Sequence, residues 1–110
     1  MTEEDALAEV AELGYHGLAF DLITEEDEPL HWHEFNAVTF VIEGSGSLRK
    51  GNGELVETGP GCRLEAPAGF LHQALAGPKQ RLVIGTDLPY GDWTMPIDKD
   101  PADLPDHLSA

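Results

Sequence analysis

Cysteine is scarce in this sequence, and long apolar runs are missing from it. The single cysteine, Cys62, has no partner for an intramolecular disulfide, so nothing calls for an oxidising compartment. No apolar run approaches the roughly 18 residues of a membrane span, and the acidic start MTEEDALAEV lacks the basic region of a signal peptide. We therefore expect a cytoplasmic protein.

Positive charge is also in short supply. Lys and Arg together number 6 against 21 Asp and Glu, which gives a formal net charge of −15 with histidine neutral. A field of this sign repels the phosphate backbone of nucleic acids and anionic membrane surfaces. We expect neither as a partner.

Glycine and proline, in contrast, are plentiful. The 12 Gly and 8 Pro divide the chain into short segments that suit strands better than helices. A chain of 110 residues that is 41% hydrophobic is expected to form one packed domain. The sequence predicts an all-β domain over residues 1–110, with a short helix at 1–14, a small antiparallel β-barrel or jelly roll at 17–87 and an irregular tail at 88–110.

Chemistry concentrates in the histidines. Alternate residues of a strand share a face, so His31 and His33 point the same way, about 6 to 7 Å apart, close enough to share a metal ion. His72 follows the turn at residues 67–69 and is the natural third ligand. Three neutral imidazoles suit one divalent transition metal ion, with Fe, Ni, Cu, Mn and Zn as candidates, and leave positions open for substrate or dioxygen. The alternative is that these are ordinary barrel histidines.

Two motifs make the chain resemble a small single-domain cupin. The first cupin motif is Gly, five residues, HxH, three or four residues, Glu, six residues and Gly, and here it reads EEDEPLHWHEFNAVTFVIEG. The second is Gly, five residues, PxG, two residues, His, three residues and Asn. In GCRLEAPAGFLHQALA, its spacing is matched by Gly61, Pro67, Gly69 and His72. The two motifs cover residues 25–76, and the resemblance implies the cupin β-barrel.

The motifs also depart from the family pattern. Ala37 stands where cupins have a glutamate ligand, and Glu25 and Ala76 replace the opening glycine and the closing asparagine. Three of the four family ligands are therefore implied, at His31, His33 and His72. Strand alternation places Glu34 on the opposite face, so we expect it to be a solvated or interface carboxylate and not a substitute ligand.

The lost glutamate has an electrostatic consequence, because three neutral imidazoles leave a divalent ion with its full charge. Enolates, carboxylates and thiolates become plausible donors, and the three-histidine set resembles that of cupin dioxygenases acting on thiols or diketones. The expected ligand is a compact, mostly apolar small molecule with one charged group. We expect the pocket wall to include Phe35, Ala37, Thr39, Cys62, Leu64 and Ala74.

The other face of the same strand is apolar as well, at Val38, Phe40 and Ile42. A helix, the tail or a second subunit must cover it, and because cupins are commonly dimers through such faces, we expect a homodimer. The tail is expected to be anchored by Tyr90, Trp93 and Met95.

Two classes of function follow from the sequence. One is a metal-dependent enzyme, with dioxygenase chemistry on an anionic substrate as the leading reaction and isomerase or lyase chemistry left open. The other is a non-catalytic cupin that binds a small ligand or metal ion for sensing, storage or structure. Fold alone does not decide between them.

Overall fold

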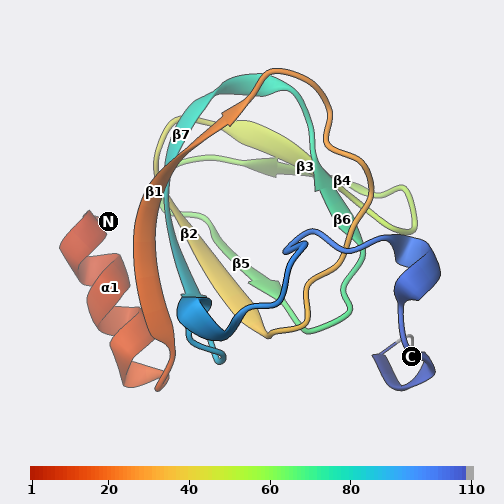
Figure 1. Ribbon diagram of the computed structural model, residues 1–110. Helices are drawn as coiled ribbons and strands as arrows, with labels where there is room; N and C mark the ends of the chain where they lie inside the picture. The colour runs from red at the N-terminus through yellow and green to blue at the C-terminus, as the bar shows by residue number, and fades with distance from the viewer. Residues whose placement is uncertain (109–110) are drawn as a thin grey trace.

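Antiparallel strands make up most of the molecule, whose computed structural model describes residues 1–108 (Figure 1). The elements are α1 (Glu3–Glu12), β1 (His16–Thr24), β2 (Ala37–Glu43), β3 (Gly46–Lys50), β4 (Leu55–Thr58), β5 (Arg63–Ala66), β6 (His72–Ala74), β7 (Gly77–Thr86) and the short 3-10 helices η1 (Tyr90–Asp92), η2 (Pro101–Asp103) and η3 (Asp106–Leu108). No helix within residues 1–108 is long and apolar enough to cross a membrane.

The strands form two sheets. One has the order β1-β7-β2-β5 and the other β4-β3-β6, and every pairing between these strands is antiparallel. Connections that pass between non-neighbouring strands give the jelly-roll arrangement seen in Figure 1. The predicted all-β antiparallel class is confirmed.

Helix α1 begins as the sequence predicts. The Thr2 hydroxyl accepts a hydrogen bond from the Asp5 backbone N–H (3.1 Å), and the Asp5 carboxylate accepts one from the Thr2 N–H (3.2 Å). This capping box satisfies N–H groups that the first turn of a helix leaves unpaired.

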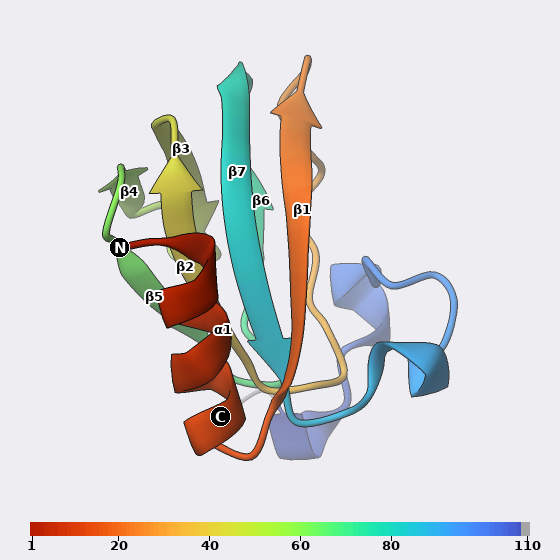
Figure 2. The same cartoon turned by 90° about the vertical axis from the view of Figure 1, so that its left-hand side faces the viewer.

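The helix lies across the outer face of the four-stranded sheet (Figure 2). Ala6 and Val10 are buried with Val38, Phe40 and Val83 in the hydrophobic core. The outward apolar stripe on β2 is therefore covered from within the chain. That stripe was the reason to expect a homodimer, and the dimer stays a prediction without this support.

The alternation used above treats residues 31–43 as one continuous strand, but the structure divides this segment. β2 begins only at Ala37, and His31 and Trp32 take part in isolated bridges to His72 and Lys99. The chain bends between Trp32 and Ala37 because Asn36 is hydrogen-bonded to two distant residues, Ala68 and Asp87. Its side-chain oxygen accepts from the Ala68 N–H (2.9 Å), and its backbone N–H donates to an Asp87 carboxylate oxygen (2.9 Å).

Candidate metal centre

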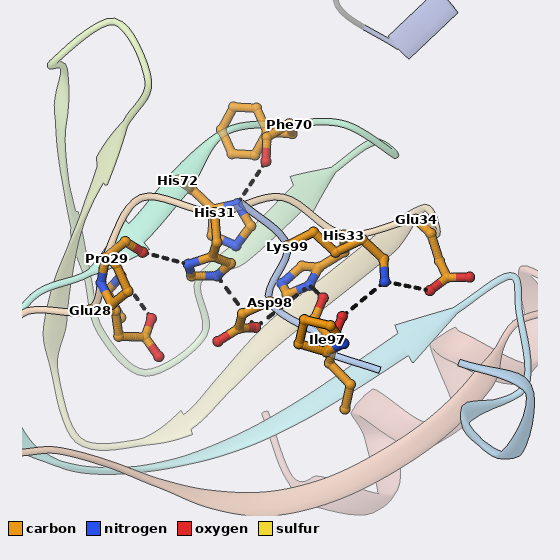
Figure 3. Close-up of polar contacts among 12 residues, drawn as sticks. Glu28, Pro29, His31, His33, Glu34, Phe70, His72, Ile97, Asp98 and Lys99 are labelled. Atoms are coloured by element: carbon orange, nitrogen blue, oxygen red, sulfur yellow. Dashed lines mark hydrogen bonds and ion pairs between the residues drawn. The ribbon is translucent and has the colours of Figure 1, made fainter. Parts of the chain in front are cut away.

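The structure brings together the three histidines that the sequence singled out (Figure 3). His31 and His72 form a two-way backbone bridge, with N–H to C=O distances of 2.9 and 3.0 Å, and His33 follows two residues later. One ring nitrogen from each of the three lies within 4.8 Å of the others. Such a cluster has the composition and spacing to hold one metal ion.

The orientation of each ring follows from one backbone hydrogen bond. In all three histidines Nδ1 is paired with a backbone carbonyl oxygen, which can only accept. The carbonyls are those of Pro29 for His31 (2.8 Å), Ile97 for His33 (3.0 Å) and Phe70 for His72 (2.8 Å). Nδ1 therefore carries the proton and donates it, which leaves each Nε2 with a free lone pair. Metal-binding histidines are commonly held by outer partners in this way.

Burial keeps the rings of His33 and His72 neutral. Desolvation lowers the pKa of His72 to about 4, and it also lowers the pKa of His33, against the raising effect of their backbone carbonyl partners. Both rings are therefore uncharged near pH 7, and a neutral imidazole is the form that binds a metal ion.

The rings face an apolar cavity of about 710 Å³ between the two sheets. An aromatic stack forms the wall beside them: the His33 and Phe35 rings are 5.1 Å apart and nearly parallel, and Trp93 stacks on Phe35 at 4.6 Å. Phe70 stacks on His72 at 5.4 Å. Aliphatic residues line much of the rest: Leu18, Leu22, Val41, Leu82 and Ile84.

Four of the six residues expected in the wall line this cavity, namely Phe35, Thr39, Leu64 and Ala74. Ala37 does not. It is 7% exposed and borders a smaller cavity with Leu13 and Tyr15, although Phe35 and Thr39 on either side of it line the main cavity.

Cys62 is also absent from the cavity wall. It lies in the turn before β5, where its N–H donates to the Gly59 carbonyl (3.0 Å) and its Sγ accepts from the Gly59 N–H (3.4 Å). Strand alternation begins only at Arg63, so it could not place the thiol correctly.

The C-terminal tail fastens a strap, residues 93–100, beside the histidines. The Lys99 backbone pairs in both directions with Trp32 (3.2 and 3.0 Å), and the Trp32 indole N–H donates to the Asp100 carbonyl (2.8 Å). Trp93 anchors the start of the strap on Phe35. Two other expected anchors fail, because Tyr90 is 56% and Met95 77% exposed.

Glu34 holds the strap from the other side. Its carboxylate accepts hydrogen bonds from the Thr94 backbone N–H (3.0 Å) and hydroxyl (2.5 Å), and it forms an ion pair with Lys99 (3.3 Å). The Thr94 hydroxyl is the main cause of a lowered Glu34 pKa. As expected, Glu34 points away from the rings (Figure 3), and it lies at the contact between the histidine segment and the tail, which it positions.

Two carboxylates at the cavity were not singled out by sequence reasoning. An Asp98 oxygen lies 3.6 Å from His31 Nε2 and 3.7 Å from His33 Nδ1 (Figure 3). Glu28 also lines the cavity, where it accepts a hydrogen bond from the Ala74 N–H (3.0 Å). Neither belongs to a local pattern with the histidines, so only the folded chain reveals them.

No protein-family model matches the sequence, and no curated protein does. Solved structures do resemble the fold. A cupin-2 domain protein from Shewanella frigidimarina matches with a TM-score of 0.54 and 20% identity, over 64% of this chain and 67% of that one. An RmlC-like cupin from the same organism matches with a TM-score of 0.57 and 15% identity, over 70% and 69% of the two chains.

An enzyme is also among the similar structures. The polyketide cyclase RemF from Streptomyces resistomycificus matches with a TM-score of 0.57 and 27% identity, over 79% of this chain and 64% of the cyclase.

Proposed function

We propose that this chain, which has the fold of a small cupin, holds one divalent transition metal ion on His31, His33 and His72 and uses it to transform a small carbonyl compound. The observation that carries the proposal is that three lone-pair nitrogens, held by backbone hydrogen bonds, meet at an apolar cavity of about 710 Å³. Because each Nδ1 is bonded to a backbone carbonyl, the Nε2 atoms are the ring nitrogens available to a metal ion.

The donor set fits the ion. Neutral imidazole is a good ligand for Fe, Ni, Cu and Zn, and Mn remains a candidate. When bound, such an ion supplies Lewis acidity, and a redox-active one supplies in addition the capacity to react with dioxygen. The protein's own part is to orient the three rings through the backbone carbonyls and to keep those of His33 and His72 neutral by burial.

The cavity suggests the class of substrate. Its wall is mainly apolar, and the Phe35 and Trp93 stack offers a flat face to a ring or a conjugated chain. An enolisable carbonyl compound such as a 1,3-diketone combines such a body with an anionic oxygen for the ion. RemF is named a polyketide cyclase, and polyketides belong to the same chemical class.

Elemental analysis of untagged protein tests the centre. We expect about one equivalent of metal in the wild type and in His16→Ala, whose histidine is exposed on β1 and serves as the matched control. His33→Ala should lose the ion while its circular dichroism stays unchanged. Equal metal content in all three proteins would refute the centre.

The need for dioxygen distinguishes the candidate reaction types. With acetylacetone as probe, uptake of dioxygen by the metal-loaded protein would identify a dioxygenase, and turnover under argon would identify cyclase, lyase or isomerase chemistry. Binding of the probe without turnover in either atmosphere would assign the chain to the non-catalytic alternative.

A further inference from the structure

We propose that Asp98, carried by the strap, is a fourth and anionic ligand of the metal centre, in place of the glutamate for which Ala37 stands. The inference rests on the proposed function, because it requires the ion on the three histidines. It assigns a role to a residue outside both sequence motifs, 26 positions beyond His72.

The position of the Asp98 carboxylate beside His31 Nε2 suits a cation bound between them. His31 Nδ1 donates to Pro29, so its Nε2 is an acceptor, and an ionised carboxylate is also only an acceptor. These two acceptors face each other at 3.6 Å, too far for a shared proton in an ordinary hydrogen bond. Two ligands at about 2.0 to 2.1 Å from a tetrahedral ion lie roughly 3.4 Å apart, which is close to this spacing.

The strap fixes the carboxylate at this place. On one side of Asp98, the Ile97 carbonyl accepts the His33 Nδ1 proton (3.0 Å), and on the other, the Lys99 backbone is paired with Trp32. The Lys99 ammonium donates to the carbonyl of Pro96 (2.8 Å) and thereby closes the strap on itself. Asp98 is thus held between two residues that are bonded directly to the histidine segment.

Competing carboxylates are already engaged. One Glu28 oxygen accepts the Ala74 N–H, and Glu34 is occupied by Thr94 and points away from the rings. Within residues 1–108, the polar contacts of the Asp98 carboxylate are to His31 Nε2 at 3.6 Å and to His33 Nδ1 at 3.7 Å. The His33 Nδ1 carries the proton that Ile97 accepts, so the His31 contact is the one on the lone-pair side that a metal ion would occupy. Its side chain is 52% exposed, which places it on the solvent side of the centre.

Asp98 would also set the charge of the site. One carboxylate reduces a divalent ion among neutral imidazoles from two net positive charges to one. The remaining charge still attracts an anionic donor, but less strongly than three histidines alone would. Removing the carboxylate should therefore weaken metal binding and strengthen binding of external anions.

The test compares Asp98→Asn with Asp103→Asn, a matched loss of one negative charge in the same tail. Zn²⁺ titration by calorimetry, with competing chelator where needed, should show an affinity at least about ten-fold lower for Asp98→Asn and unchanged within about two-fold for Asp103→Asn. Co²⁺-loaded Asp98→Asn should have altered visible absorption and bind azide more tightly than the wild type.

The outcomes separate the two proposals. Wild-type protein that binds no metal would refute the proposed centre itself. Wild type and Asp98→Asn with the same Zn²⁺ affinity and the same Co²⁺ spectrum would refute the role of Asp98 and leave the three-histidine centre standing. Equal weakening in both variants would show a general charge effect and also refute it.

Discussion

At the scale of single residues, burial and hydrogen bonding prepare the histidines in opposite ways. Desolvation lowers the pKa of His33 and of His72, while the backbone carbonyl bonded to each ring fixes its tautomer and partly opposes this lowering. Because burial is the larger effect for His72, its ring stays neutral well below the pH at which an exposed histidine becomes charged. A neutral, fixed ring is ready for a metal ion at neutral pH.

This lowered pKa predicts acid sensitivity of the metal-free protein. The His72 pKa is about 4 when folded and about 6.5 when unfolded, so the unfolded chain binds more protons between these values. Stability is present above pH 6.5 and is lost as the pH falls toward 4. The loss should be about 1 to 3 kcal/mol, allowing for partial exposure of the ring.

Urea unfolding at pH 7.5 and pH 4.5 measures this loss in the free energy of unfolding. His72→Gln, which lacks the titrating ring, is the reference. The wild type should lose more stability on acidification than His72→Gln does. Parallel losses in the two proteins would contradict the prediction.

At the scale of elements, α1 can lie close to the sheet because β7 has a glycine, Gly85, beneath Val10. A Cβ added at Gly85 would be 2.6 Å from Val10 Cγ1, closer than such contacts allow. Gly85→Ala should therefore push the helix outward and destabilise the protein by about 1 to 3 kcal/mol. Gly59→Ala is the control, since a Cβ there meets no atom within 4 Å. Equal thermal stability of the two variants would contradict this account of the helix packing.

The strap is a second element whose attachment can be measured. Trp93→Ala removes the stack on Phe35, an interaction worth about 1 kcal/mol beyond area burial. The Lys99 amide, bonded to Trp32, should then exchange its hydrogen at least about five-fold faster, as local opening becomes easier. Tyr90→Ala, at an exposed position that meets Trp93 only edge-on, should leave the rate unchanged. A rate unaffected by Trp93→Ala would contradict a role for this stack in holding the strap.

At the scale of the whole molecule, the net charge of −15 opposes compactness. Salt shortens the range of this repulsion from about 30 Å at 0.01 M to about 8 Å at 0.15 M. Raising NaCl over this range should stabilise the metal-free protein by on the order of 1 kcal/mol, or about 4 to 8 °C in melting temperature. Choline chloride at equal ionic strength should raise the melting temperature by the same amount. A rise in melting temperature with NaCl but not with choline chloride would indicate specific sodium binding instead of screening.

The all-β class, the short N-terminal helix and the cluster of three histidines could be predicted from the sequence alone. These features depend on short-range patterns: alternation along a strand, the Thr2 and Asp5 box, and motif spacings within residues 25–76. Such patterns lie within short segments of the chain, so they can be identified without knowing how the rest of the chain packs.

Only the tertiary structure decided which groups surround the histidines. Asp98 and Trp93 reach the cavity through a tail whose path is set by Glu34 and Trp32, far away in sequence. Ala37 borders a smaller cavity with Leu13 and Tyr15, which come from a distant part of the sequence and which strand alternation does not reveal. The physical reason is common to these cases: contacts between distant segments form only when the whole chain packs, and no local periodicity encodes them.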